Sequence, residues 1–210
     1  MDEDQARAIL DVPRETSVRI EAFIAFLRSE NERQNLVSRG SLDQVWNRHI
    51  LDSAQLTRFA PSPSSSWIDL GTGAGLPGLI VALLHSGPIT LVETRKLRVD
   101  FLSRASEMLE LGDRVEIIHS KVEALQPREF DVISARAFAP LHRLLELGER
   151  FAAAKTRWVL PKGKNAKSEL VAAQALWQGD FRLEQSLTDP DAQIIVAEQV
   201  RRRTRGKQRR

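Results

Sequence analysis

The 210-residue chain has no cysteine and no tyrosine. Without cysteine it forms no disulfide or thiolate zinc site, and it has no cysteine nucleophile. Its longest uninterrupted apolar stretch, residues 79–84, is far shorter than the roughly 20 residues of a membrane-spanning helix. The first five residues, Met-Asp-Glu-Asp-Gln, lack the basic and apolar regions of a secretion signal. We therefore expect a cytoplasmic protein with no metal site and no membrane partner.

Positive charge is concentrated at the C-terminal end. The net charge is +3, but residues 201–210 carry seven basic side chains and no acidic one, so the rest of the chain has a net charge of −4 (+3 minus +7). We expect residues 201–210 to form a disordered basic tail. Two interpretations of this tail stay open: an ordinary solvated end, or a segment that binds RNA phosphates without sequence preference.

Apolar periodicity divides the chain into two regions. Residues 1–60 are mostly helical in pattern and form an N-terminal helical extension, which ends at the breaker-rich segment Pro-Ser-Pro-Ser-Ser-Ser. Residues 61–200 alternate between short strands and helices, which predicts one α/β domain with a doubly wound, mostly parallel sheet. We expect strands at 67–70, 89–93, 115–118, 130–135 and 157–160, helices at 77–85, 96–109, 141–153 and 168–177, and a final apolar run at 194–197.

A glycine-dense turn follows the first of these strands. The pattern Asp69-x-Gly71-x-Gly73-x-Gly75 allows the backbone to approach a ligand closely. The dinucleotide fingerprint Gly-x-Gly-x-x-Gly would need a glycine at position 76, where this chain has Leu76. The pattern instead resembles the first motif of S-adenosylmethionine-dependent methyltransferases, whose Rossmann-like class I fold matches the predicted sheet.

An acidic residue follows the second strand at the distance that a nucleoside site requires. Glu93 ends the apolar run 89–93 and lies 22 positions after Gly71, where a carboxylate accepts hydrogen bonds from both ribose hydroxyls. The glycine turn alone is weak evidence, because a tight strand-to-helix corner that binds nothing has the same composition. Glu93 at this spacing favours a bound nucleoside cofactor.

Several short motifs follow one another along about residues 31–164. They are Asn35-Leu-Val-Ser38, Arg48-His-Ile-Leu-Asp-Ser53, Asp69-Leu-Gly-Thr-Gly-Ala-Gly-Leu-Pro-Gly78, Ser134-Ala-Arg-Ala-Phe138 and Lys162-Gly163. Together, and in this order, they are similar to the motifs of the bacterial ribosomal small-subunit methyltransferase G family, also called glucose-inhibited division protein B. The resemblance implies S-adenosylmethionine-dependent methylation of guanine N7 in the 530 loop of 16S rRNA, at nucleotide 527. We expect a monomer that acts on 16S rRNA in the 30S subunit or an assembly intermediate.

The chemistry of the sequence is consistent with N7 methylation. Methylation of pyrimidine C5 normally uses a cysteine adduct, and the chain has no cysteine. Methylation of an exocyclic amine usually carries Asp/Asn-Pro-Pro-Tyr/Phe after the fourth strand, where this chain has Asp131-Val-Ile-Ser-Ala-Arg136. Guanine N7 is a free lone pair, so its alkylation needs alignment rather than a base, and alignment can supply about 7–11 kcal/mol.

The resemblance implies a set of cofactor-binding residues. The backbone of the glycine turn lines the methionine and ribose, Glu93 binds the ribose, and a Val-Glu pair after the third strand holds the adenine. For that pair a solvated helix start is the simpler alternative. The residues are Gly71, Gly73, Leu76, Glu93, Val122 and Glu123.

Arg136 is the expected catalytic residue and also a cofactor-binding residue. It follows the fourth strand, where it faces both cofactor and substrate, and a guanidinium pairs with a carboxylate, a phosphate or guanine O6. The alternative is a purely structural salt bridge to Asp131 or Glu146.

Four residues are candidates for binding RNA: Asn35, Arg48, His49 and Lys162. Arg48 and Asp52 lie one helical turn apart, so an RNA-facing cluster and an ordinary helix surface pair with His49 partly buried are equally supported. Lys162 is expected in a flexible loop that presents it to phosphate, with an exposed lysine as the ordinary alternative.

One segment departs from the family pattern, and two other functions remain open. Many members have Gly-x-Arg-His before the last strand, but residues 189–194 contain neither Arg nor His, so no site is predicted there. One alternative is a Rossmann oxidoreductase, disfavoured by Leu76 and by the lack of a Tyr-x-x-x-Lys pair. The other is a non-catalytic RNA-binding assembly factor with a vestigial cofactor pocket.

Overall fold

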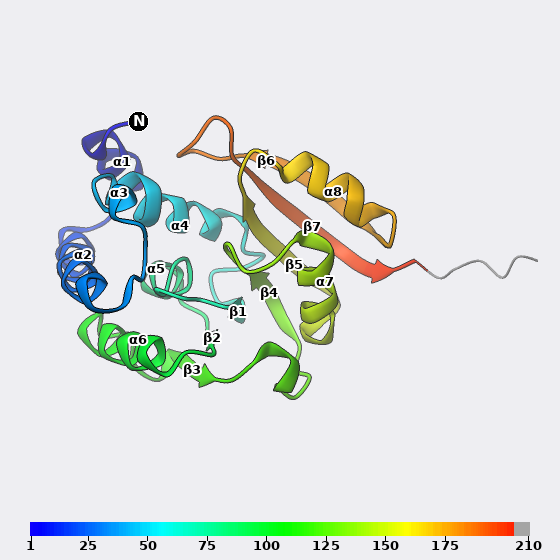
Figure 1. The fold of residues 1–210 in the computed structure, drawn as a ribbon, viewed down its shortest axis with the longest axis horizontal. Coiled ribbons are helices and arrows are strands. Elements are labelled where there is room, and N and C mark those ends of the chain that lie inside the picture. The colour runs from blue at the N-terminus through cyan, green and yellow to red at the C-terminus, as the bar shows by residue number, and fades with distance from the viewer. Residues whose placement is uncertain (204–210) are drawn as a thin grey trace, which may run out of the picture.

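The computed structural model describes residues 1–203 (Figure 1). The chain begins with a helical region in which Asp2 caps the first helix by accepting from the backbone N–H of Gln5. Its elements are α1 (Glu3–Leu10), α2 (Arg14–Gln34), α3 (Arg39–Leu42), the π-helical turn η1 (Trp46–Leu51), α4 (Asp52–Ala54) and the 3-10 turn η2 (Gln55–Phe59).

The rest of the chain forms a seven-stranded sheet with the order β3-β2-β1-β4-β5-β7-β6. Strands β1 to β5 are parallel, while β7 runs antiparallel between β5 and β6. The sheet is therefore mostly parallel, as predicted. The strands are β1 (Trp67–Leu70), β2 (Ile89–Glu93), β3 (Val115–His119), β4 (Phe130–Ser134), β5 (Ala152–Lys162), β6 (Trp177–Gln185) and β7 (Gln193–Arg202).

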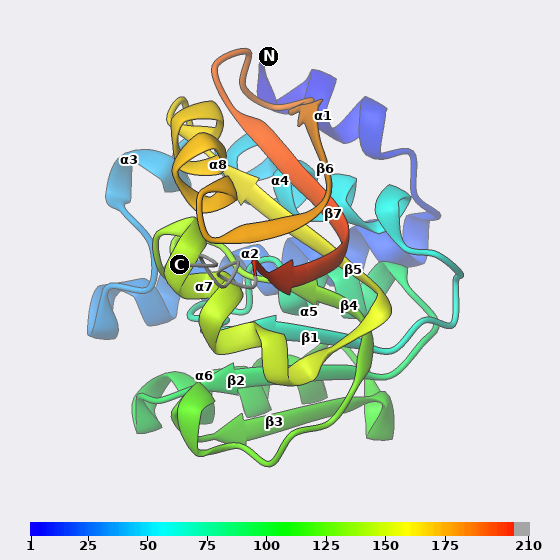
Figure 2. The same ribbon diagram turned by 90° about the vertical axis from the view of Figure 1, so that its right-hand side faces the viewer.

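Helices cover both faces of the sheet (Figures 1 and 2). On one face α5 and α6 pack together with α2, where the rings of Phe26 and Phe101 stack with centroids 5.1 Å apart. The N-terminal helices thus share one apolar core with the sheet, whereas α7 and α8 bury the core of the opposite face. The helices are α5 (Gly78–Leu84), α6 (Lys96–Met108), α7 (Leu141–Gly148) and α8 (Ala166–Gln174), with short turns η3 (Gly112–Arg114), η4 (Val122–Ala124) and η5 (Glu149–Phe151).

Three expectations from the sequence need correction. Strand β6 was not predicted, because its nine residues are mostly polar and, at the sheet edge, need only half-burial. Strand β5 begins at Ala152, so the helix predicted at 141–153 ends earlier. Strand β7 extends through Arg202, so the basic tail does not begin at 201; residues 204–210 of that prediction lie outside the described residues.

The topology brings distant loops together at one end of the strands. The carboxyl ends of the parallel strands lie there, and Lys162 at the end of β5 pairs with Gln193 at the start of β7. The β6–β7 loop, residues 186–192, therefore lies at the same end of the sheet as the glycine turn after β1, which is where doubly wound folds bind ligands. Strand β7 runs away from this end and finishes at the opposite end of the sheet.

Candidate functional site

The glycine turn after β1 has backbone geometry that other residues rarely adopt. Gly71, Gly73 and Gly75 have φ angles of +67°, +60° and +76°. A Cβ atom at Gly71 would overlap the ring of Phe138, so this position also needs glycine for lack of space. The turn closes with a hydrogen bond from the Gly75 N–H to the Thr72 carbonyl (3.0 Å). The result is a compact corner that exposes backbone to a ligand.

Asp69 connects this turn to the start of α5 and to the end of β4 through hydrogen bonds. It is fully buried: one carboxylate oxygen accepts from the N–H of Gly78 at the start of α5 (3.1 Å), and the other accepts from the hydroxyl of Ser134 at the end of β4 (2.7 Å). Trp67 Nε1 donates to the same hydroxyl (2.8 Å). Burial raises the pKa of Asp69 to about 6, although these hydrogen bonds favour its charged form.

Glu93 lies beside the turn, as its spacing predicted. The carboxylate is buried and accepts from the N–H groups of Gly73 (3.1 Å), Thr94 (2.7 Å) and Arg95 (2.9 Å). Arg98 lies 3.6 Å from it. The oxygens of a carboxylate at a nucleoside site accept hydrogen bonds from the two ribose hydroxyls, as the Glu93 oxygens accept from N–H groups here. The glycine turn and Glu93 together therefore fit S-adenosylmethionine.

Val122 and Glu123 lie in the turn that follows β3. They lie in η4, and Ser120 just before it donates from its N–H to the Glu93 carbonyl (3.0 Å), which places this turn next to β2. Val122 is buried in the core. The Glu123 side chain is half exposed and pairs with Arg143 of α7 (3.3 Å), and the Glu123 carbonyl accepts from Arg150 (2.6 Å).

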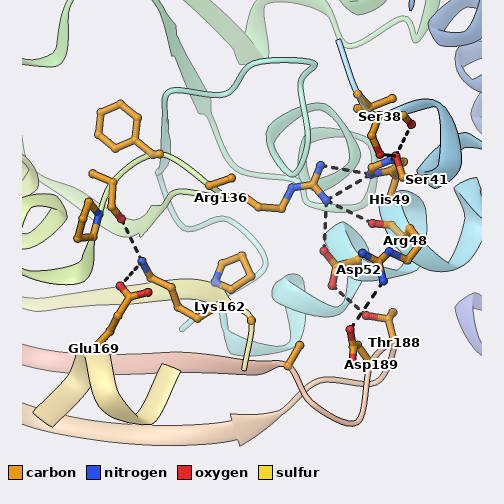
Figure 3. A pocket seen from close by; sticks show the side chains of 18 residues that line it. Ser38, Ser41, Arg48, His49, Asp52, Arg136, Lys162, Glu169, Thr188 and Asp189 are labelled. Carbon is orange, nitrogen blue, oxygen red and sulfur yellow. Dashed lines mark hydrogen bonds and ion pairs between the residues drawn. The ribbon is translucent and has the colours of Figure 1, made fainter. Parts of the chain in front are cut away.

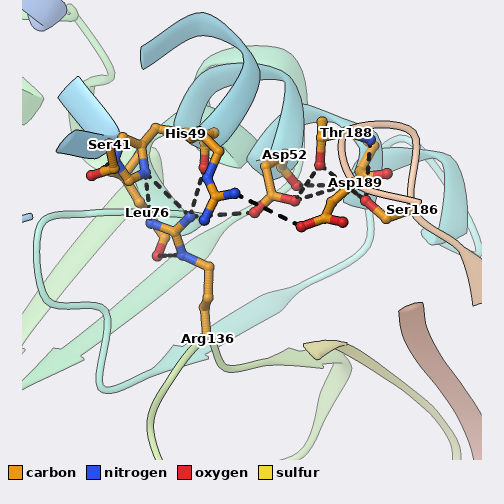
Figure 4. A network of polar contacts seen from close by, with 10 residues as sticks. Ser41, His49, Asp52, Leu76, Arg136, Ser186, Thr188 and Asp189 are labelled. Carbon is orange, nitrogen blue, oxygen red and sulfur yellow. Dashed lines mark hydrogen bonds and ion pairs between the residues drawn. The ribbon is translucent and has the colours of Figure 1, made fainter. Parts of the chain in front are cut away.

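Arg136 joins the glycine turn to the N-terminal region (Figure 4). Its Nε donates to the carbonyl of Leu76 (3.2 Å), and its Nη1 donates to the carbonyl of Arg48 and to Asp52 Oδ2 (both 3.3 Å). Both Nη atoms lie 3.4 Å from His49 Nδ1. The Arg136 side chain is about one-fifth exposed. It therefore contacts the cofactor corner and the predicted RNA-facing cluster at the same time.

The two acids named from the sequence as possible salt-bridge partners of Arg136 do not pair with it. Asp131 instead accepts from the backbone and hydroxyl of Ser66 (2.7 and 2.8 Å). Glu146 pairs with Arg143 and Arg202 on the surface. The acid that pairs with Arg136 is Asp52, from a segment 84 positions earlier.

His49 is a buried neutral ring. Its Nε2 lies 2.9 Å from the hydroxyl of Ser41, and its Nδ1 faces Arg136, so Nδ1 is the acceptor and Nε2 carries the proton. Burial, followed by the nearby charges of Arg136 and Arg48, lowers the pKa of His49 to about 3. His49 is thus uncharged at physiological pH and orients Arg136.

A cavity of about 860 Å³ opens beside this network (Figure 3). Arg48, His49, Arg136 and Lys162 line it, so the structure brings together three of the four RNA candidates. Asn35 is not among its lining residues; it is an exposed residue that ends α2 in a left-handed conformation. The Arg48 side chain is half exposed at the cavity and lies 3.7 Å from Asp189.

Lys162 differs from its prediction. It is the last residue of β5 rather than part of a flexible loop, and its side chain is only 12% exposed. Its Nζ donates to Glu169 (2.9 Å) and to the carbonyl of Ala139 (3.1 Å). Lys162 therefore holds the loop after β4 in place. The sequence motif Lys-Gly could not indicate this role, because Glu169 and Ala139 come from other segments of the chain.

The β6–β7 loop supplies residues that sequence reasoning missed. The Thr188 hydroxyl donates a hydrogen bond to Asp52 Oδ1 (2.9 Å), and Asp189 and Ala192 line the cavity. No site was predicted at 189–194 because the family's Arg-His is absent there. The only available signal was position, since a loop before the last strand of this fold returns to the ligand-binding edge.

The described residues contain no group of three or more His, Asp or Glu side chains placed to hold a metal ion. Within residues 1–203, no helix is long and apolar enough to cross a membrane.

The sheet and its flanking helices have the fold of class I S-adenosylmethionine-dependent methyltransferases. Two solved structures share the fold: ribosomal protein L11 methylase from Lactobacillus delbrueckii (TM-score 0.58, 14% identity, 73% of this chain and 78% of that one) and an S-adenosylmethionine-dependent methyltransferase from Aquifex aeolicus (TM-score 0.56, 16% identity, 70% and 88%).

Sequence comparison identifies the family. The family model described as rRNA small subunit methyltransferase G matches residues 17–195. Proteins named ribosomal RNA small subunit methyltransferase G are 49% identical in Rhizorhabdus wittichii (98% of this chain, 97% of the relative) and 45% identical in Zymomonas mobilis (91% and 89%). The chain belongs to this family: it is an enzyme, its cofactor is S-adenosylmethionine, and its substrate is small-subunit rRNA.

Proposed function

We propose that this chain methylates N7 of one guanine in the 530 loop of 16S rRNA, at nucleotide 527. The observation that carries the proposal is the contact of Arg136 Nε with the Leu76 carbonyl (3.2 Å), because it joins the cofactor corner to the large cavity. A base in that cavity lies within reach of a methyl group held at the glycine turn. We further propose that the enzyme is a cytoplasmic monomer that acts on the 30S subunit or an assembly intermediate.

The cofactor-binding roles divide between backbone and carboxylate. The backbone of Gly71, Gly73 and Leu76 supports the methionine and ribose, and Glu93 accepts from the ribose hydroxyls. The backbone at Val122 and Glu123 borders the adenine. S-adenosylmethionine supplies an activated methyl group on a sulfonium; the protein supplies its position.

The side chains in the cavity favour alkylation of a lone pair over proton abstraction. His49 is neutral, with both ring nitrogens engaged and a pKa lowered to about 3. Asp52 accepts from Arg136 and Thr188, and Glu169 accepts from Lys162. Guanine N7 carries no proton, so a site whose acids and bases are already paired suits it, and alignment supplies the rate enhancement.

Arg136 holds the geometry and Arg48 contacts RNA. The donors of Arg136 connect Leu76 with the segment that contains His49 and Asp52, so it sets the distance between cofactor and base. Arg48, half exposed beside the cavity and weakly paired at 3.7 Å, is the cation available for an RNA phosphate.

Transfer of a tritiated methyl group to 30S subunits, compared with free 16S rRNA, tests the proposal. We expect incorporation of about one methyl group per subunit, located at N7 of a single guanine. Arg136→Ala should lower both the rate and the affinity for S-adenosylmethionine. Arg128→Ala, which removes a surface arginine paired with Glu116 (2.8 Å), is the matched control and should change neither. Binding of RNA without methyl transfer would support the assembly-factor alternative.

A further inference from the structure

We propose that Phe138 is the residue on which the target guanine stacks while N7 is methylated. This inference rests on the proposed function, because it takes guanine N7 as the methyl acceptor. It assigns a role to a ring of the cavity wall that takes part in none of the polar contacts described above.

The ring of Phe138 stands between the glycine turn and the cavity. Its Cγ, Cδ2 and Cε2 atoms pack so closely on Gly71 that a Cβ there would overlap them. The same side chain is half-buried and lines the cavity of about 860 Å³. A methyl group that passes from a donor at the turn to a base in the cavity therefore passes beside this ring.

The backbone around Phe138 is held on both sides. Lys162 Nζ donates to the carbonyl of Ala139 (3.1 Å), and Glu169 accepts from the first N–H of α7 (2.8 Å). Ala137 has a φ of +51°, a conformation that is strained for a residue other than glycine and persists only where neighbours enforce it. The loop thus presents the ring in a fixed place, as a stacking surface requires.

Phe138 is also the one suitable ring of this cavity. Among the lining residues in the described part of the chain, it is the single Phe, Trp or Tyr. Bases extruded from RNA are held by stacking on such rings. The imidazole of His49 is engaged at both nitrogens by Ser41 and Arg136.

The reaction makes this stacking stronger as it proceeds. The N7 lone pair forms the new bond to the methyl carbon, the bond between that carbon and the donor sulfur breaks, and its electron pair stays on sulfur. The positive charge moves from the sulfonium to the guanine ring, and no proton is transferred. A cation over an aromatic face is attracted by the electrons of the ring, so Phe138 stabilises the transition state more than the bound substrate.

The test compares Phe138→Leu with Phe138→Trp. Phe181→Leu is the matched control, because Phe181 on β6 is also half-buried but lies outside the cavity. In single-turnover methyl transfer to 30S subunits, we expect Phe138→Leu to be about tenfold slower, and the other two variants to stay within about twofold of the unmodified enzyme.

A binding measurement supplies a readout that does not depend on turnover. Titration calorimetry with guanosine 5′-monophosphate and its N7-methylated, cationic form should show a severalfold preference for the methylated nucleotide. Phe138→Leu should lose this preference and Phe138→Trp should keep it. An unchanged rate and an unchanged preference in Phe138→Leu would overturn the stacking role.

Two outcomes keep the proposals separable. If the unmodified enzyme leaves guanine N7 unmethylated, the proposed function fails and the stacking proposal falls with it. If the enzyme methylates N7 but the Phe138 variants match it, only the stacking proposal fails. Where Phe138→Leu does not fold, Phe138→Tyr and Phe138→Trp decide: near-normal rates support stacking, and a tenfold loss in both overturns it.

Discussion

Asp69→Asn is expected to remove a pH dependence from the stability of the folded chain. Burial raises the pKa of Asp69 from its ordinary value of 3.8 to about 6. The folded state therefore favours the neutral carboxyl, so this contribution to stability is fully present below pH 3.8 and is lost as the pH rises through about 6. Over that window the loss amounts to about 3 kcal/mol, because each tenfold change in proton affinity corresponds to about 1.4 kcal/mol.

Urea unfolding at several pH values measures this effect. The difference in unfolding free energy between the unmodified chain and Asp69→Asn cancels the titration of other carboxylates. Between about pH 4.5 and about pH 7.5 the unmodified chain should lose about 2 kcal/mol relative to the variant. A constant difference across this range would mean that Asp69 titrates alike in the folded and unfolded states, contrary to this prediction.

Three other substitutions test the packing and the polar contacts of the site. In urea unfolding, Gly71→Ala should lower the free energy of unfolding by about 2–4 kcal/mol. Gly112 has a φ of +60° but open space around it, so Gly112→Ala should lower that free energy by only about 1 kcal/mol. Equal losses in the two variants would mean that overlap with the Phe138 ring does not limit position 71. Thr188→Val should lose about 1 kcal/mol and raise the KM for 30S subunits, and an unchanged KM would mean that the loop does not position Asp52. Lys162→Met should lower the melting temperature by a few degrees, and a normal melting temperature with weaker RNA binding would restore Lys162 as a phosphate contact.

The sequence predicted the half of the site that depends on local pattern. Strands β1, β2 and β4 are short, mostly apolar and buried runs in a parallel sheet, and such strands stand out as hydrophobic segments in the sequence. The turn after β1 was predictable because glycine spacing reports backbone geometry directly. Glu93 followed from its distance to that turn, and the structure places the two in hydrogen-bond contact.

The other half depends on contacts between distant segments. Thr188 and Asp52 are 136 positions apart, and nothing in either local sequence indicates that they meet. Strand β6 is a polar edge strand, so it lacks the apolar run that marks a central strand. Lys162 was expected in solvent because exposed lysines are the rule, and its burial required a carboxylate on α8 to pair with it.

Mass analysis of 16S rRNA from cells with and without this chain tests whether it methylates guanine N7 in the 530 loop. With the unmodified chain, N7-methylguanine should occur in the 530-loop fragment; without it, or with Arg136→Ala in its place, that signal should be lost or strongly reduced. An N7-methylguanine signal that is the same in the presence and absence of the chain would show that another enzyme methylates this position.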